Sequence, residues 1–507
     1  MVKRTRGAIL QSIQFDPKSA QSLTTQILIA VRNLILSGGL RAGERLPSTR
    51  TLAKDLGVSR NTIVGVFDRL LAEGLLEARI GAGTFIVEIQ SFEQALSDRE
   101  PKLSDFSGLN LNVQIQLKNK NYQENTLSQD PSKFAPRLGH GVRAFTTALP
   151  ALDLFPVAQW SRLTSKHWRG SRDVVLGYGK RVGYLPLQQS IAAFLRASLG
   201  IDCRDEQIFV TNGAQQAFHV IGSFLLKPND TVWFENPGAL GARNALVAAR
   251  AKLQPIPVDQ DGIIVKEGLR RAPDFRLAFV TPTHQQPLGV KMSLARRIEL
   301  LKAAEAANAW IIEDDYDSEF HYGNHRLPSL KSLDQNDRVL YVGTFSKTLF
   351  PEIRLGYILA PESLVDSFTR IFESVLPNVS TSSQAVLSSF MDEGHFGAHL
   401  RRMRRIYSER HQVLLDCAKE HLNGLLDVRP VEAGLHTVGY LPKELSEERV
   451  AERADKYGVS VVPLRKYCIE PTDLNGLSLG FSGVNASQLL NGVMTLQKVC
   501  HELLAET

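Results

Sequence analysis

Lys347 is the first residue of chemical interest, because it stands in the stretch "TFSKTLFPEIRLGY" (residues 344–357) directly after the apolar run "RVLYVG". That run has the composition of a buried strand, so the lysine falls on the loop that follows it. A lysine whose amine attacks an aldehyde needs such a rigid loop and a lowered pKa. A lone lysine after a strand is more often an ordinary surface residue, so the choice depends on its neighbours.

Two further side chains suit the same chemistry. Asp314 ends the predicted strand "AWIIED", where its carboxylate can face a pyridine nitrogen and keep it protonated as an electron sink. Tyr316 follows two positions later and offers its phenol to a ring hydroxyl. Asp315 and Asp317 are interpreted as structural neighbours, since one carboxylate suffices for the ring nitrogen.

A phosphate cradle is predicted at "TNGAQQAF" (residues 211–218), where a strand ends and Gly213, Ala214 and Gln215 open a helix. The first turn of a helix has backbone N–H groups free for an anion. Thr344 and Arg354, on either side of the lysine, add a hydroxyl and a charged fork. Small residues after strands commonly only make turns, but the whole set describes a site for pyridoxal 5′-phosphate (PLP).

A different chemistry is indicated upstream, in "RLPSTRTLAKDLGVSRNTI" (residues 45–63). Residues 21–37 have helical apolar spacing, and Ser48 and Ser59 stand where their side chains can cap two further helices, the first of which ends at Gly57. The following "LLEARIGAGTFIV" predicts a hairpin with a Gly-containing turn. This order is typical of a winged helix-turn-helix.

The second of these helices opens with "SRNT", the end that a helix-turn-helix directs at base edges. Arg60 and Asn61 are the predicted base readers, because Arg pairs with guanine and Asn with adenine through two hydrogen bonds, while Arg45 and Arg50 are predicted phosphate contacts. The alternative is a solvated basic hairpin that contacts only protein. The predicted DNA-binding set is Arg45, Ser48, Arg50, Ser59, Arg60, Asn61, Thr62, Gly81 and Gly83.

Length and composition allow two unlike parts. The chain has 507 residues, 43% of them hydrophobic and 22% charged, as in a folded globular protein, and its formal charge of +6 weakly favours a polyanionic partner. No apolar run is long enough to span a bilayer or to form a signal peptide, so we expect a cytoplasmic protein without a membrane partner. The four cysteines are widely spaced and predict neither a disulfide framework nor a metal site.

Three regions are expected along the chain. Residues 1–90 would form the winged helix, and the polar stretch 91–135 an interdomain linker. In residues 136–507, short apolar runs such as "TVWFE" and "RVLYVGT" alternate with helical patterns, which predicts an α/β domain with a largely parallel sheet. Polar and Gly-rich residues follow most of these strands, where such sheets bind ligands.

The run "LPSTRTLAKDLGVSRNTIVGVFDRLLAEGLLEARIGAGTFI" resembles the winged helix of GntR-type bacterial transcription regulators, and the chain from about residue 140 onward resembles fold type I aminotransferases. Together they resemble the MocR subfamily. The resemblance implies a head-to-tail homodimer and an operator with repeated half-sites. It also implies that Lys347 forms the internal aldimine, that Asp314 and Tyr316 pair with the ring nitrogen and hydroxyl, and that the phosphate is held by Gly213, Ala214, Gln215, Thr344 and Arg354.

The chain departs from that family's pattern in places. Ala239, in "ENPGAL", stands where members commonly have an aromatic residue that can stack on the cofactor ring, which opens space on one ring face or weakens cofactor binding. Gln286 replaces another common aromatic residue; it either hydrogen-bonds the ring hydroxyl or is an ordinary loop residue. Arg465 and Arg243 are candidates for holding an effector carboxylate, and structural cations otherwise.

Three functions are therefore weighed. The first is a DNA-binding transcription regulator in which an amine or amino-acid effector displaces Lys347 and shifts the large domain between two conformations. The second is a PLP-dependent aminotransferase with an accessory winged helix, since Lys347 is also suited to move the proton that transamination requires. The third is a regulator that senses PLP itself.

Overall fold

The computed structural model describes residues 22–36, 40, 43–79, 83–87, 134–136, 138–139, 141–170, 172–323 and 326–506. The chain divides into two compact units, residues 1–133 and 134–507. Of the predicted linker 91–135, all but the last two residues lie outside the described part, as does Gly81 of the predicted wing. No helix in the described part is long and apolar enough to cross a membrane.

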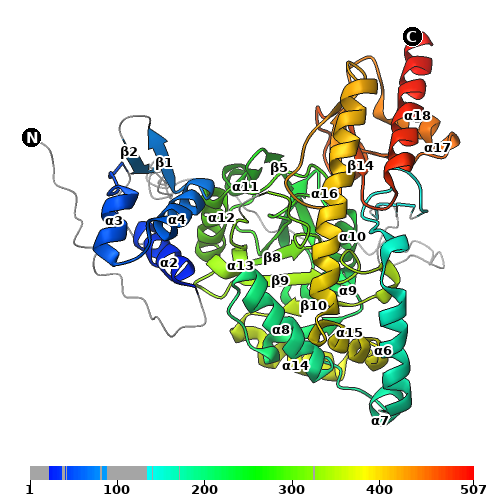
Figure 1. Ribbon diagram of the computed structural model, residues 1–507. Helices are drawn as coiled ribbons and strands as arrows, with labels where there is room; N and C mark the ends of the chain where they lie inside the picture. Colours follow the sequence, from blue (N-terminus) through cyan, green and yellow to red (C-terminus); the bar gives the residue numbers. More distant parts are fainter. Residues whose placement is uncertain are drawn as a thin grey trace, which may run out of the picture. The chain divides into compact units, whose positions relative to one another are not determined.

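The described part of the small unit contains three helices and a hairpin (Figure 1). The predicted caps are confirmed: the Ser48 and Ser59 side chains accept hydrogen bonds from the N–H groups of Thr51 and Thr62, both at 3.1 Å, and Gly57 ends α3 with a φ of 67°. The predicted hairpin is also confirmed, because β1 and β2 pair antiparallel. The elements are α2 (Leu23–Leu36), α3 (Thr49–Leu56), α4 (Arg60–Ala72), β1 (Leu76–Arg79) and β2 (Gly83–Ile86).

The large unit is built on an eight-stranded sheet with the order β3-β10-β9-β8-β7-β4-β5-β6. Pairs β4–β5, β4–β7, β7–β8 and β8–β9 are parallel, whereas β10 and β6 run against their neighbours, so the sheet is largely parallel as predicted. Its strands are β3 (Ile208–Thr211), β4 (Thr231–Asn236), β5 (Lys252–Asp259), β6 (Gly262–Ile263), β7 (Leu277–Val280), β8 (Trp310–Asp315), β9 (Val339–Thr344) and β10 (Gly356–Leu359).

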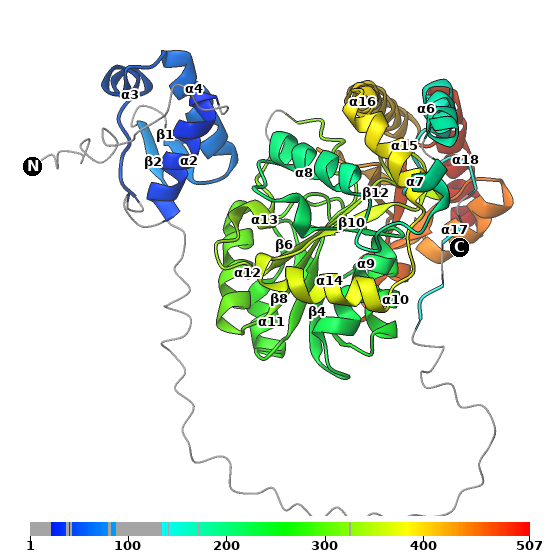
Figure 2. The same cartoon turned by 90° about the horizontal axis from the view of Figure 1, so that it is seen from below.

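Both faces of this sheet are buried, because successive side chains of each strand enter opposite apolar layers. In β4, Val232 and Phe234 join the apolar layer under α9 (Ala214–Leu225), α10 (Leu240–Ala248) and α14 (Val365–Ser374). Figure 2 shows these three helices beside the sheet. Trp233 enters the opposite layer with α11 (Val265–Arg271), α12 (Leu294–Ala306) and α13 (Leu330–Leu333). This double burial explains the continuous apolar runs read from the sequence.

A second sheet, of four antiparallel strands in the order β11-β12-β14-β13, was not predicted. Figure 1 shows the long helix α16 running from beside α15 to beside α18 and β14. The elements are β11 (Asp427–Val428), β12 (His436–Tyr440), β13 (Val462–Pro463), β14 (Gly476–Gly480), α6 (Val157–Gly170), α7 (Arg172–Leu176), α8 (Leu185–Leu199), α15 (Thr381–Asp392), α16 (His395–His421), α17 (Glu447–Lys456) and α18 (Ala486–Ala505), with the 3-10 helices η2 (Leu152–Leu154), η3 (Asp205–Gln207), η4 (Pro351–Ile353), η5 (Glu362–Leu364) and η6 (Leu464–Tyr467).

Candidate functional site

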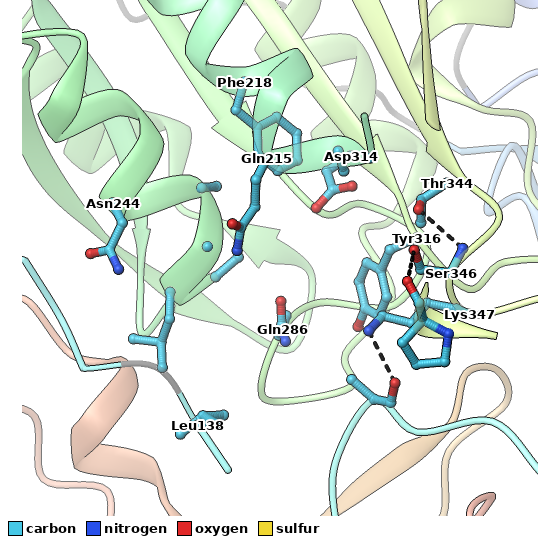
Figure 3. Close-up of a pocket in the computed structure, with 18 of the residues that line it drawn as sticks. Leu138, Gln215, Phe218, Asn244, Gln286, Asp314, Tyr316, Thr344, Ser346 and Lys347 are labelled. Carbon is cyan, nitrogen blue, oxygen red and sulfur yellow. Dashed lines mark hydrogen bonds between the residues drawn. The ribbon is translucent and has the colours of Figure 1, made fainter. Parts of the chain in front are cut away.

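A pocket of about 430 Å³ lies where β8, β9 and the N-terminus of α9 meet. Carboxyl ends of parallel strands share one edge of the sheet, so residues far apart in the sequence meet there. Figure 3 draws Gln286, Asp314, Tyr316 and Lys347 around the same space. The structure places in the pocket wall all nine predicted cofactor residues, namely Gly213, Ala214, Gln215, Gln286, Asp314, Tyr316, Thr344, Lys347 and Arg354.

Lys347 lies on the loop after β9, between Ser346 and Thr348. Its Nζ donates a hydrogen bond to the main-chain oxygen of Ala148 at 3.0 Å (Figure 3). Burial lowers the pKa of the amine, while the nearby carboxylates of Asp317 and Asp314 act in the opposite direction. A lowered pKa leaves more of the lysine neutral, and the neutral amine is the nucleophile.

Asp314, near the end of β8, is a buried acid, and one of its carboxylate oxygens receives no hydrogen bond from the described residues. The residue is 6% exposed, and its Oδ1 has no hydrogen-bond partner among the described residues. Burial raises the pKa of the carboxyl well above its ordinary value, and the neighbouring acids Asp315, Asp317 and Glu235 raise it further. An unpaired buried carboxylate is costly, so this atom fits a ligand that brings a cationic N–H group.

The other end of the pocket suits an anion. Helix α9 begins after Gly213, whose φ of 79° turns the chain into the helix, and its first turn has neither an acidic residue nor a side-chain cap. A methyl group at Gly356 would lie 3.1 Å from the main-chain nitrogen of Ala214, so β10 packs closely behind this turn. Arg354 lines the same pocket from a left-handed conformation with a φ of 51°, which a non-glycine residue adopts at a cost.

Several lining residues were not predicted. Ser346 stands directly before the lysine in the quoted stretch, so its hydroxyl was a signal that went unused; its N–H donates to Thr344 Oγ1 at 3.2 Å. Asn212, likewise, precedes the predicted glycine turn. Tyr467 had no such signal, because it comes from η6 of the second sheet region. Burial raises the pKa of its phenol to about 12, so it acts as a neutral hydroxyl.

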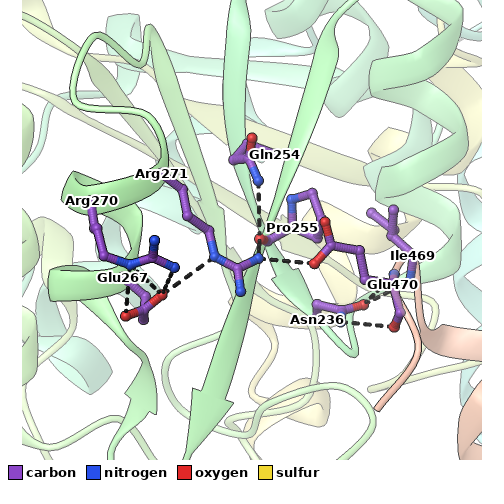
Figure 4. A network of polar contacts seen from close by, with 8 residues as sticks. All are labelled: Asn236, Gln254, Pro255, Glu267, Arg270, Arg271, Ile469 and Glu470. Carbon is purple, nitrogen blue, oxygen red and sulfur yellow. Dashed lines mark hydrogen bonds and ion pairs between the residues drawn. The ribbon is translucent and has the colours of Figure 1, made fainter.

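A polar network fixes the segment that carries Tyr467 to the main sheet (Figure 4). Asn236, at the end of β4, accepts a hydrogen bond from Ile469 N–H at 2.7 Å. Its side-chain amide also donates to the main-chain oxygen of Glu470 at 3.1 Å. Arg271 Nη1 bonds a Glu470 carboxylate oxygen at 2.9 Å. Gly238 N–H also donates to the main-chain oxygen of Tyr467 at 3.1 Å, so this wall of the pocket is held to the end of β4.

The two arginines suggested for an effector carboxylate are not among the residues that line the pocket. Arg243 donates to the Cys468 main-chain oxygen at 3.1 Å, and burial lowers the pKa of its guanidinium. Arg465 is exposed and lies 3.4 Å from a Glu448 oxygen. Within the described residues, the cationic side chains in the pocket wall are those of Lys347 and Arg354.

The remaining predictions concern the ring face. Ala239 lines the pocket, so a small side chain occupies this part of the wall. Gln286 also lines it, and its N–H is held by Thr281 Oγ1 at 3.1 Å. The Tyr316 phenol, expected to meet a ring hydroxyl, donates to the main-chain oxygen of His284 at 2.9 Å.

In the small unit, the predicted DNA-contacting side chains lie on two neighbouring elements. Arg50, Arg60 and Asn61 are exposed, on α3 and at the start of α4. The Arg45 guanidinium lies against β2, since a methyl group at Gly83 would be 2.8 Å from its Nε. Ser48 and Ser59 hold their helix N-termini, and Ser59 also bonds the Thr62 hydroxyl at 2.8 Å.

Residues 152–474 match the family described as aminotransferase class I and II, and residues 23–86 match bacterial regulatory proteins, gntR family. The chain is 37% identical over 479 residues to the probable rhizopine catabolism regulatory protein MocR of Rhizobium meliloti, covering 93% of this chain and 92% of that protein. It is 30% identical to the pyridoxine biosynthesis transcriptional regulator PdxR of Corynebacterium glutamicum, covering 92% of this chain and 94% of that protein.

The chain belongs to the MocR subfamily of GntR-type transcription regulators. Its winged helix is accordingly a DNA-binding domain. The large unit of this MocR-type regulator resembles LysN, the α-aminoadipate aminotransferase of Thermus thermophilus, with a TM-score of 0.66 and 27% identity over 72% of this chain and 93% of LysN. That structure holds N-(5′-phosphopyridoxyl)-L-leucine, and the family and its neighbours indicate PLP as the cofactor here.

The pocket of this MocR-type chain fits PLP at both of its ends. The donorless oxygen of Asp314 matches a protonated pyridine nitrogen, and the uncapped start of α9, together with Arg354, matches a phosphate. Lys347 lies in the wall of the same cavity with a lowered pKa. The match thus rests on three separate chemical requirements that one cavity meets.

Glu235 beneath this pocket makes the stability of the protein depend on pH. It is fully buried, accepts from Thr281 Oγ1 at 2.7 Å and Gln285 Nε2 at 3.2 Å, and burial raises its pKa to about 7 from an ordinary 4.5. Between these values the folded chain keeps a proton that the unfolded chain releases. Its stabilising contribution is therefore complete below pH 4.5 and is lost as the pH rises through about 7.

We expect Glu235→Gln to remove this dependence. From about pH 5 to about pH 8, wild type should lose about 2–3 kcal/mol of unfolding free energy relative to the variant, from the pKa difference alone. Denaturant unfolding of both chains across that range measures the difference, and other buried acids cancel in the comparison. Parallel pH profiles for the two chains would contradict the assignment.

Proposed function

We propose that this regulator senses a primary amine or amino acid at Lys347 and thereby changes how its winged helix binds operator DNA. The proposal depends mainly on the pocket, in which Lys347, with its lowered pKa, lies with Asp314, a buried aspartate with an oxygen that receives no hydrogen bond from the described residues. The same chain also has a DNA-binding domain. PLP, when bound, supplies an aldehyde that condenses reversibly with primary amines. The part of this chain is to hold that aldehyde beside Lys347 and to exclude water from it.

We assign the holding roles to residues that line the pocket. Asp314 pairs with the ring nitrogen, and the N-terminal turn of α9 with Arg354, Thr344 and Ser346 holds the phosphate. Supporting this division, Asp314 is buried with a raised pKa, whereas Arg354 is exposed at the pocket rim. With PLP bound, an effector amine would take the place of Lys347, and the freed lysine side chain would alter the balance between two conformations of the domain.

We further propose that the chain works in the cytoplasm as a head-to-tail homodimer on an operator with repeated half-sites. Large apolar side chains exposed on the large unit support an interface between copies: Val157, Trp168, Leu176 and Tyr178 are 65%, 52%, 67% and 103% exposed. They fall on α6, α7 and the segment after α7. Exposed apolar groups of this kind mark protein interfaces.

One feature also supports the alternative that the protein is an active aminotransferase: Lys347 is suited to the proton transfer that transamination requires. An amino-acid substrate, however, needs its carboxylate neutralised, and the described pocket wall offers only Lys347 and Arg354 as cations. Both already have roles in holding the cofactor. The same lack applies to an amino-acid effector, so this pocket favours sensing of a carboxylate-free amine over turnover of an amino acid.

The test is operator binding by purified protein loaded with PLP, measured by fluorescence anisotropy on DNA from upstream of its own gene. We expect one member of a panel containing an α-amino acid, an ω-amino acid and a carboxylate-free amine to change both the visible absorbance and the DNA affinity. A response to PLP alone would show that the cofactor is the signal. Sustained turnover with a keto acid, with no sequence preference on DNA, would establish the enzyme instead.

A further inference from the structure

His284 and Asp317 form a buried polar pair directly behind Tyr316. His284 Nδ1 lies 3.0 and 3.2 Å from the two carboxylate oxygens of Asp317, and both side chains are 1% exposed. The same Nδ1 lies 3.1 Å from the Tyr316 hydroxyl, which donates its proton to the main-chain oxygen of His284 at 2.9 Å. His284 thus contacts the phenol through both its ring and its backbone.

The surroundings leave this pair only one arrangement. Leu435 N–H donates to Asp317 Oδ2 at 3.1 Å, which fixes the carboxylate. Gly434, with a φ of 87°, packs directly against the pair, because a methyl group there would lie 2.0 Å from His284 Nδ1 and 2.7 Å from Asp317 Oδ2. The consistent proton placement has the imidazole N–H directed at the carboxylate and at the phenol oxygen, while the phenol keeps its own proton on the backbone.

A metal ion is the other chemistry that this cluster suggests. His284, Asp317 and His436 each offer a ligand atom, and these atoms lie within 4.8 Å of one another. The space facing His284 Nδ1 and Asp317 Oδ2 is nevertheless filled by the backbone of Gly434, and His436 Nε2 lies 3.1 Å from the Pro287 oxygen. A hydrogen-bonded pair accounts for the cluster without an ion.

We propose that Asp317 and His284 are positioning residues that hold the phenol of Tyr316 toward the pocket and so set the pH at which the link between Lys347 and the cofactor takes up its proton. The inference rests on cofactor attachment at Lys347, as proposed above, but it needs neither an effector nor DNA. Tyr316 is the lining residue that the pair touches, so the pair acts through it. An imidazole N–H that points at the phenol oxygen holds the neutral phenol in place, and Asp317 keeps the imidazole ring in this orientation.

Other ionisable groups face this region and stay constant in the comparison. Asp314 of β8, Glu235 of β4 and Tyr467 of η6 act on Tyr316, and Asp314 and Asp317 act on Lys347. The ring of His436 on β12 lies tilted against that of His284, with centroids 4.5 Å apart, and His411 of α16 is close enough to interact electrostatically with His284. Each of these groups remains in a variant that changes only His284.

The experiment is a pH titration of the visible absorbance of the PLP-loaded full chain, carried out as a double-mutant cycle. We expect Tyr316→Phe and His284→Asn each to move the titration midpoint by more than about half a pH unit, and His284→Asn to have no further effect in the Tyr316→Phe background. His436→Asn is the matched control, because the His436 ring lies tilted against that of His284 and His436 is outside the pocket-lining set; any shift that it causes should be the same in the wild-type and Tyr316→Phe backgrounds.

The outcomes separate this proposal from the one it rests on. An unshifted midpoint in His284→Asn, or a full additional shift in the Tyr316→Phe background, overturns the positioning role. Asp317→Asn, which keeps the shape of the carboxylate, serves as the second variant if His284→Asn does not fold. Asp317 also acts on Lys347 directly, so only the part of its shift that disappears in the Tyr316→Phe background counts as positioning, and a shift of the same size in both backgrounds overturns the role. If wild type shows no visible band with PLP, cofactor attachment at Lys347 fails and this proposal fails with it.

Discussion

Replacing Lys347 with alanine is expected to abolish covalent attachment of PLP while leaving DNA binding intact. Lys347 lies in the wall of the cavity beside Asp314, and burial lowers the pKa of its amine, which favours attack on an aldehyde. After borohydride reduction, mass spectrometry should find one pyridoxyl group on each wild-type chain and none on Lys347→Ala. The winged helix belongs to the other compact unit, so DNA binding in the absence of effector should remain.

The matched control is Lys291→Ala, which removes a half-buried lysine that pairs with the exposed Glu432 in the same unit. It should keep the adduct and the visible band unchanged. Effector response should be lost in Lys347→Ala alone, since an amine can no longer displace a tether that is absent. A pyridoxyl adduct that persists on Lys347→Ala would place the Schiff-base lysine elsewhere and would remove the basis of the sensing mechanism.

The cofactor pocket was largely predictable because each predicted residue directly follows or precedes a recognisable strand. Asp314 is the penultimate residue of β8, Lys347 follows β9 and Gly213 follows β3. Strands β8 and β9 are parallel, and β3 runs in the same direction as β9 because both are antiparallel to β10, so these ends meet at one edge. Local sequence is therefore enough to bring such residues together. The family pattern added the chemical roles, which the pocket geometry supports without testing them one by one.

The parts that escaped prediction depend on long-range packing. Tyr467 enters the pocket from a 3-10 helix next to short strands of two to five residues, whose patterns are too brief to be recognised. Arg465 was chosen because an effector-binding arginine is expected late in the chain, and Arg243 for its charge. Nothing local reveals that Arg243 holds the Cys468 carbonyl or that Arg465 faces solvent near Glu448. Charge without a known neighbour is a weak predictor of a site.

His284 illustrates the same limit from within a motif. It stands two residues before Gln286 in "TPTHQQPLG", and the sequence offers no sign that Asp317 and Gly434 enclose it. Asp317 was interpreted only as a structural neighbour of Asp314, yet it bonds the ring that contacts Tyr316. The residues that orient a site come from several loops, and only the folded chain brings these loops together.

Arg60→Ala is expected to reduce strongly the preference of the protein for its operator over unrelated DNA. Arg60 is exposed at the first position of α4, which Ser59 caps, so its guanidinium extends from the end of the helix that enters the major groove in this fold. A bidentate Arg–guanine contact contributes about 1–3 kcal/mol of discrimination, so specific binding should weaken about 5- to 150-fold while nonspecific binding changes little. Anisotropy titrations on operator and scrambled duplexes measure the two affinities.

Two matched variants separate base reading from charge. Arg69→Ala removes an exposed arginine from the last turn of the same helix and should leave the specificity ratio unchanged, because that end points away from the bases. Arg50→Ala, on α3, should weaken binding to both duplexes equally and reduce the salt dependence by about one phosphate contact. If Arg60→Ala behaves like Arg50→Ala, with the ratio of the two affinities preserved, Arg60 contacts a phosphate, and base reading passes to Asn61, the next exposed side chain of α4.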